Sequence, residues 1–320
     1  ISVYMSRFYT AEDLAMGPQI EQHSSHMVMT NVSQENRVKY VNIDSKFRDD
    51  YDSHVDGPVD FMVTLPSPIT HVQSMKVENI EIPLSFYNVS KALGNSYFAV
   101  DYYDGTAGHK DELVVTIPDG QYDTISSLTT AVQTAFNAAS NGPTVTVTTS
   151  GSRVTMTATL TAPDSKYVIK FPASETGGDD KYNVKGKLGW TLGFTSLSET
   201  ITPDTDTVTA TNVYDLTRPR VIYMYIDEFS QSKSNSFTTV MTRSQNSDNI
   251  IAKISTNRAT NIMRSVFPAN EKNGYLLSDH RYYNGKCDIK RLRVQLLDEF
   301  DRKIDLNGLD FSFSLRIVHK

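Results

Sequence analysis

The spacing of apolar residues constrains the fold of this chain most, because it repeats every two positions along much of the sequence. Phe311, Phe313, Leu315 and Ile317, for example, alternate with polar residues. A period of two places the apolar side chains on one face of a β-strand. Eight or nine runs of this kind occur outside residues 112–200, with turn residues between them. The sequence therefore predicts a protein dominated by β-strands.

Residues 112–200 differ because they contain the one convincing helix, at 124–139. Its apolar residues recur at helical spacing, Asp123 or Thr124 can cap its start, and Asn141-Gly142-Pro143 ends it. Strand-like runs precede and follow the helix, at 113–117, 144–149, 153–160 and 167–171. These elements predict a small α/β unit with the order β-α-β-β-β.

The number of strands outside that unit suits an eight-stranded antiparallel sandwich of the jelly-roll type. We therefore expect a jelly-roll domain over residues 37–111 and 201–320, with residues 112–200 inserted in one long loop. Residues 1–36 show no sustained period and are expected to form an N-terminal arm. Within 71–83 the apolar phase shifts from Met75 and Val77 to Ile80 and Ile82, which predicts a β-bulge.

Composition excludes several classes of protein. The chain has 320 residues, 31 Lys and Arg against 37 Asp and Glu, and a formal net charge of −6, so nothing marks a general nucleic-acid binder. Its single cysteine, Cys287, excludes an internal disulfide framework and is expected to be a buried, inert thiol. No run approaches the roughly 18 apolar residues that a membrane-spanning helix needs.

Motifs of enzymes and metal sites are missing from the sequence. It has no nucleophile elbow, phosphate-binding loop, dinucleotide glycine motif or zinc-protease motif, and its seven histidines are scattered. The adjacent carboxylates Asp227-Glu228 and Asp298-Glu299 point to opposite faces of a strand, so neither pair can converge on a glycosidic bond. We expect no catalytic residue, no cofactor and no metal site.

Aromatic and basic residues gather between positions 275 and 303. Because Tyr and Arg are enriched at protein interfaces, they form a candidate interface. Acidic residues interrupt the basic ones, so a solvated strand face is the competing interpretation. The candidate residues are Tyr275, Arg281, Tyr282, Tyr283, Arg291 and Arg293.

The only tryptophan suggests a second hypothesis, a host-attachment module that binds glycan through the inserted unit. Trp190 with nearby Tyr182 and Asp179-Asp180 could form a platform, because aromatic rings stack on the apolar faces of sugars. The alternative is that Trp190 anchors the core of the inserted unit.

Three groups of segments, in order along residues 37–320, resemble capsid proteins of the large nucleocytoplasmic DNA viruses, which include chlorella viruses and mimiviruses. The first comprises residues 41–48, 60–69 and 72–83, with Ile43-Asp44-Ser45 followed by Arg48. The second comprises residues 115–122 and Leu192-Gly193-Phe194. The third comprises residues 296–302, 304–308 and 310–315, similar to the endings of penton and minor capsid proteins.

This resemblance implies a jelly-roll structural protein of the virion, without catalysis or cofactor. The chain would be a penton at the fivefold vertex or a minor capsid protein that cements the shell. The implied partners are the major capsid protein, other minor capsid proteins and further copies of the chain as a pentamer. The implied location is the virion capsid, assembled in the host cytoplasm.

Overall fold

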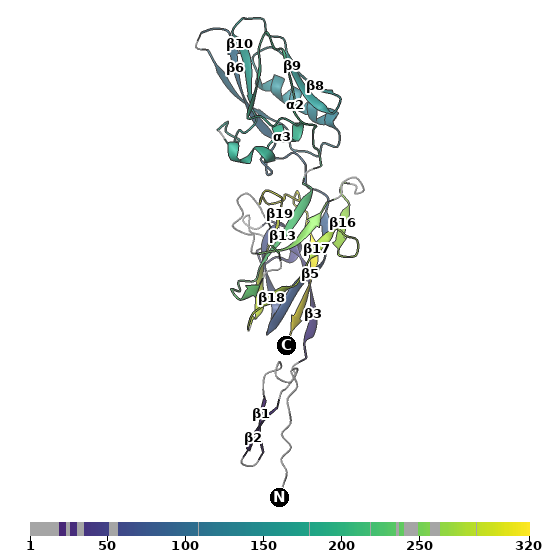
Figure 1. Cartoon of the computed structure of the whole chain (residues 1–320). Helices are drawn as coiled ribbons and strands as arrows, with labels where there is room; N and C mark the ends of the chain where they lie inside the picture. The colour runs from purple at the N-terminus through teal and green to yellow at the C-terminus, as the bar shows by residue number, and fades with distance from the viewer. Residues whose placement is uncertain are drawn as a thin grey trace.

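The computed structural model describes residues 35–50, 57–107, 109–178, 180–217, 219–234, 237–239, 249–256, 263–285 and 287–320, with the backbone of two short strands nearer the N-terminus. Two lobes stacked end to end make up most of it (Figure 1). Each lobe has its own cluster of buried apolar side chains, one from residues 43–86 and 222–317 and the other from residues 89–210. The second lobe is thus one continuous segment of the chain, and the first lobe is formed by the residues before and after it.

The first lobe contains two antiparallel sheets that enclose one core. In one sheet the strand order is β14 (Lys233–Ser234), β18 (Arg281–Tyr283), β5 (Val72–Pro83), β20 (Ser312–His319) and β3 (Arg37–Asp44), and β16 (Val266–Asn270) also pairs with β5. In the other sheet the order is β17 (Leu276–Ser278), β15 (Ile250–Ser255), β13 (Val221–Asp227), β19 (Ile289–Leu297) and β4 (Asp60–Ile69). A short 3-10 helix, η1 (Ser45–Phe47), follows β3.

These strands pair as a jelly roll. β3 pairs with β20, β4 with β19, β5 with β18 and β13 with β15, so pairing proceeds inward from the two ends of the domain. The pairs β5–β20 and β13–β19 join these couples into the two sheets. These eight strands form the predicted antiparallel jelly roll, which is therefore confirmed, and the short strands β14, β16 and β17 extend its two sheets. The second lobe is inserted between β5 and β13.

The predicted bulge lies in β5. Its register with β20 changes where Ser314 pairs with Asn79 and Leu315 pairs with Val77, which leaves Glu78 as the extra residue. One extra residue reverses the alternation of side chains. Val77 and Ile80 are consequently both buried in the core, which explains the phase shift in the sequence.

The second lobe consists of two smaller sheets and a helix. One sheet has the order β11 (Ser198–Ile201), β10 (Ser165–Lys170), β6 (Tyr97–Asp104) and β7 (Asp111–Thr116), and the other has β12 (Thr207–Thr209), β9 (Arg153–Ala158) and β8 (Val145–Ser150). Its helices are α2 (Ile125–Ala139), η2 (Lys181–Gly186) and α3 (Leu188–Leu192). The order β7-α2-β8-β9-β10 matches the predicted unit.

Two strands within the residue ranges expected to form the jelly roll pair inside the second lobe. β6 pairs with β7 and β10, and β12 pairs with β9. Alternation predicted the β6 strand but not the sheet that it joins, and the short β12 lies in a polar segment that was not predicted to be a strand. We infer that the inserted unit extends beyond residues 112–200 at both ends, from Val89 to Leu216.

Helix α2 begins at a predicted cap and covers the open edge of β8. The side chain of Thr124 caps the first turn. Farther along, the amide of Asn137 donates to the carbonyl oxygen of Val145 at 2.9 Å and accepts from its N–H at 2.8 Å. Gln133 accepts from the N–H of Val147 at 2.9 Å. Side chains of the helix thus replace a neighbouring strand along this edge.

Part of the predicted N-terminal arm forms a hairpin. β1 (Gln19–His23) and β2 (His26–Thr30) pair antiparallel in a sheet of their own. The hairpin lies beyond the end of the sandwich that is opposite to the inserted lobe (Figure 1). Apart from residues 35 and 36, the rest of the arm lies outside the described residues.

Candidate functional site

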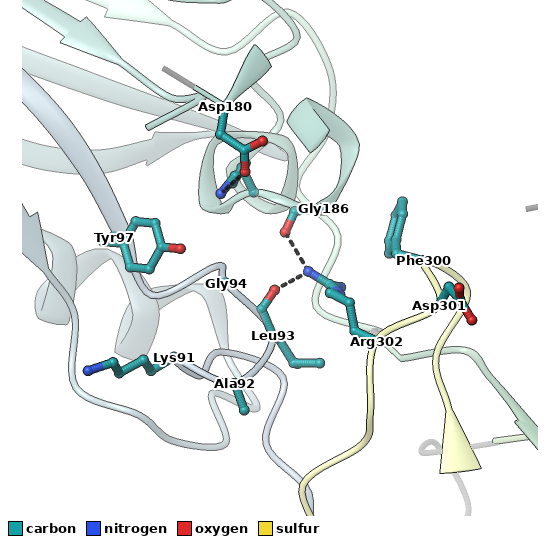
Figure 2. Close-up of a pocket in the computed structure, with 11 residues that line it drawn as sticks. Lys91, Ala92, Leu93, Gly94, Tyr97, Asp180, Gly186, Phe300, Asp301 and Arg302 are labelled. Atoms are coloured by element: carbon teal, nitrogen blue, oxygen red, sulfur yellow. Dashed lines mark hydrogen bonds and ion pairs between the residues drawn. The ribbon is translucent and has the colours of Figure 1, made fainter. Parts of the chain in front are cut away.

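A cleft of about 480 Å³ lies where the two lobes meet (Figure 2). The first wall comes from residues 91–94 and Tyr97, at the start of β6. The second wall comes from the turn around η2, and the third from the loop between β19 and β20. The remaining lining residues are Asp180, Gly186, Lys187, Phe300, Asp301 and Arg302.

Arg302 joins the two lobes across this cleft. Its Nη1 donates hydrogen bonds to the carbonyl oxygens of Leu93 and Gly186 in the second lobe, the latter at 3.4 Å (Figure 2). Its Nε donates to Oδ2 of Asp298 at 2.8 Å, and Asp298 is a buried residue of the first lobe. One guanidinium therefore ties a buried carboxylate of the sandwich to two backbone segments of the insertion.

The loop that presents Arg302 is held by the same carboxylate. Oδ1 of Asp298 accepts from the backbone N–H of Phe300 at 2.8 Å and of Arg302 at 2.9 Å. Asp301 has a left-handed backbone with φ of +63°, which completes the tight turn. Burial and, second, the nearby Asp298 raise the pKa of Asp301. Contacts inside the sandwich thus order this loop, and they do not depend on the insertion.

The two lysines that line the cleft are also paired. Lys187 is buried, its ammonium lies 2.7 Å from a carboxylate oxygen of Asp180, and it stands 5.1 Å from the centroid of the Tyr97 ring. Lys91 forms an ion pair with Glu175 at the rim. Because these ion pairs neutralise its lysines, we interpret the cleft as a contact region that holds the two lobes in one orientation.

Metal ligands do not cluster in the described part of the chain: it contains no group of three His, Cys, Asp or Glu side chains that could hold an ion. Cys287 is a buried free thiol, as predicted, and burial raises its pKa. Within the described ranges, no helix is long and apolar enough to cross a membrane.

Half of the predicted interface residues lie in or against the core of the sandwich. Arg281 and Tyr283 are only 1% and 5% exposed, and the ring of Tyr275 packs against Phe267 with 5.1 Å between ring centroids. Arg281 instead forms a buried ion pair, with its Nη1 2.7 Å from Oε2 of Glu228. This corrects the expectation that Arg281 and Tyr283 face a partner, because alternation along β18 turns both side chains inward.

The exposed members of the predicted interface lie on different sheets. Tyr282 is exposed on β18, whereas Arg291 and Arg293 are exposed on β19 of the opposite sheet. Arg291 pairs with Asp49 at 3.5 Å, and Arg293 pairs with Asp60 at 3.1 Å. The six residues therefore do not form one continuous surface.

The predicted glycan platform is only partly described. The side chain of Tyr182 and all of Asp179 lie outside the described residues, and Asp180 pairs with Lys187. Trp190 is partly exposed on α3, with the ammonium of Lys185 6.0 Å from its ring centroid. Glycan binding through Trp190 stays a prediction.

Sequence reasoning missed the residues that hold the cleft. Asp298 and Arg302 stand four positions apart with opposite charge, a signal of local pairing. Nothing in the sequence shows that Arg302 also reaches Leu93, because that contact joins positions 209 residues apart.

The comparisons with known proteins give the following results. No protein-family model and no curated protein matches the sequence. A solved structure of the mavirus penton protein aligns with 89% of this chain and 99% of its own, at 14% sequence identity and a TM-score of 0.38. With a TM-score that low, the evidence for the jelly roll is the strand pairing within this chain.

Proposed function

We propose that the chain is a structural protein of a viral capsid, either a penton or a minor capsid subunit. One observation carries this proposal: the segments that resemble capsid proteins contact one another or fix the joint between the lobes. The residues that this chain has in common with those capsid proteins therefore serve the architecture, which is a jelly roll with an insertion held in one orientation.

The first and third groups of segments meet behind η1. Oγ of Ser45 donates to Oδ1 of Asp310 at 2.7 Å and accepts from the N–H of Phe311 at 3.0 Å. Nη1 of Arg48 donates to the same Asp310 oxygen at 3.1 Å and to the carbonyl oxygen of Ser45 at 2.8 Å. The Asp-Ser-x-x-Arg element thus joins the beginning of the sandwich to its end.

The second group fixes turns of the insertion. Gly193 has φ of +95°, and a Cβ there would lie 2.3 Å from the carbonyl oxygen of Asn212, so only glycine fits. Oδ1 of Asp119 accepts from the N–H of Lys91 at 2.8 Å, in the segment that enters the lobe. The third group supplies Asp298 and Arg302 of the cleft.

This architecture suits a shell subunit. The sandwich is a rigid block, the insertion projects from one of its ends, and the N-terminal hairpin extends from the other (Figure 1). Identical blocks that meet through different patches close into rings when the rotation allows it. The proposed partners are the major capsid protein, other minor capsid proteins and further copies as a vertex pentamer, assembled in the host cytoplasm.

The proposal is tested by locating the chain in virus particles. Cryo-electron microscopy with antibody labelling of the insertion should place it in the shell, and quantitative mass spectrometry should give its ratio to the major capsid protein. Five copies around each fivefold axis identify a penton, and density elsewhere in the shell identifies a minor capsid protein. Absence from purified particles overturns the proposal.

A further inference from the structure

We propose that the open edge of β3 receives the β1–β2 hairpin of a second copy of this chain, so that one sheet continues across the subunit boundary. This inference rests on the proposed function only in assuming that copies assemble. It names the two surfaces that would meet, which are the backbone edge of β3 and strand β2.

Among the edge strands of the sandwich, β3 is the longest that contains no proline. It ends the six-stranded sheet and pairs only with β20 among the strands that the structure describes. At the edge of the other sheet, β4 contains Pro66 and Pro68, which lack an N–H. Asp49 covers part of β4, accepting from the N–H of Thr64 at 2.8 Å and donating its own N–H to the carbonyl oxygen of Met62 at 2.9 Å. The remaining edges, β14, β16 and β17, have two, five and three residues, and β16 contains Pro268.

Along the β3 edge, exposed apolar side chains alternate with the charged Arg37 and Lys39. Residues 37–40 are all exposed, and among them Val38 and Tyr40 retain 45% and 59% of their surface. Phe47, which follows in η1, retains 73%. Proteins usually protect long edge strands with charges, prolines or a covering segment. In β3 two charges are present, but Val38 and Tyr40 stay exposed and none of the described strands pairs with this edge, which makes it a candidate pairing site.

The β1–β2 hairpin lacks a third strand, which the open edge of β3 could provide. A two-stranded sheet is at best marginally stable alone and gains stability from a third strand. Within β2 the run Met27-Val28-Met29 is apolar at successive positions, which is typical of a strand covered on both faces. Adding β2 to the edge of β3 would supply the third strand for the hairpin and would cover the apolar edge.

The partner is a second copy because the hairpin stands apart from its own β3. Residues 31–36 connect β2 to β3, yet the two strands belong to separate sheets. Every copy carries one hairpin and one open edge. A contact between two different surfaces of identical subunits can repeat from copy to copy and close a ring.

Disulfide trapping between two single variants tests this pairing. Full-length chains carrying Val28→Cys and Tyr40→Cys are mixed and oxidised, while the natural Cys287 is buried. We expect a two-chain product whose disulfide joins position 28 of one chain to position 40 of the other. Val28→Cys mixed with Lys290→Cys, an exposed position on the opposite sheet, is the control and should give at least tenfold less product.

Three outcomes overturn the inference: no two-chain product, equal trapping with Lys290→Cys, or a disulfide formed only within one chain that carries both Val28→Cys and Tyr40→Cys. Hydrogen exchange provides a measurement without substitutions in β3. Amides of residues 37–41 should exchange more slowly at high protein concentration, and deleting residues 1–34 should abolish that difference.

The two proposals can fail separately. If the disulfide between copies forms but the chain is absent from virus particles, only the proposed function is overturned. A capsid location without trapping overturns only this inference.

Discussion

At the scale of single residues, the most consequential side chain is the buried arginine of β18. Arg281 donates to Oε2 of Glu228 and to the carbonyl oxygens of Ile226 and Asn249, at 2.7 to 2.8 Å. Burying two charges is costly unless each is paired and hydrogen-bonded. Removing one partner therefore leaves the other as an uncompensated charge in the core.

We expect Arg281→Met to lower the free energy of unfolding by about 3–5 kcal/mol, because Glu228 would remain buried without its cation. The double variant Arg281→Met/Glu228→Leu should recover most of this loss. Urea unfolding of the sandwich followed by circular dichroism measures both, because the only tryptophan, Trp190, lies in the inserted lobe. Arg291→Met, on the exposed face of β19, is the matched control and should change stability by less than about 0.5 kcal/mol. A single variant as stable as the control would contradict the role of the pair.

Asp60 should make the stability of the sandwich depend on pH. Burial alone would raise the pKa of this carboxyl, but hydrogen bonds from Arg293 and Lys303 outweigh it and lower the pKa. A lowered pKa stabilises the folded state above the ordinary Asp value of about 3.9, and the contribution is lost as pH falls through the folded-state pKa. Asp60→Asn should therefore be less stable than the wild type near neutral pH, and this difference in stability should shrink as pH falls through the folded-state pKa of Asp60. Urea midpoints across this pH range measure the difference. Asp204→Asn, at an exposed carboxylate, should show no difference at any pH.

Trp190 carries the alternative hypothesis of glycan recognition. If its partly exposed ring binds sugar, Trp190→Ala should abolish binding on a glycan array while circular dichroism stays unchanged. Wild-type protein that binds no glycan on the array would reject the hypothesis.

At the scale of elements, α2 illustrates what local pattern predicts well. Its cap and its apolar spacing predicted a helix over 124–139, and the structure has it at Ile125–Ala139. The sequence did not show that the helix also protects a strand edge. That role depends on Gln133 and Asn137 meeting the backbone of β8, which only packing brings close.

We expect Asn137→Ala to destabilise the insertion by about 1–3 kcal/mol, because the N–H and carbonyl of Val145 would lose their partner. Hydrogen exchange should show faster exchange at residues 145–149 and no change in the β-strands of the jelly roll. Thr134→Ala, on the exposed face of the same helix, is the control and should leave exchange in β8 unaltered. Equal exchange in the two variants would show that the helix does not protect this edge.

At the scale of the whole molecule, the orientation of the lobes depends on the cleft. Two chain segments connect the lobes, and Arg302 adds a contact from a loop that belongs to the sandwich. The hydrogen bonds of a charged group are each worth about 1.5–3 kcal/mol. That is enough to hold one orientation and too little to determine whether either lobe folds.

We expect Arg302→Met to leave both lobes folded and to free their relative motion. Small-angle X-ray scattering should show a broader distribution of interatomic distances, while circular dichroism stays the same. Arg291→Met keeps the cleft intact and should scatter like the wild type. Unchanged scattering from Arg302→Met would show that the connecting segments alone set the orientation.

The sequence by itself determined most of the long strands, where the one long helix of the insertion begins and where β5 bulges. These features depend on side-chain alternation, capping and turn chemistry, which act over a few neighbouring residues. Only the tertiary structure decided that β6 and β12 belong to the insertion, that Arg281 points inward and that Arg302 reaches Leu93. Strand partners and buried charges are selected by contacts between positions hundreds of residues apart, where the free energy of burial, rather than local pattern, decides the outcome.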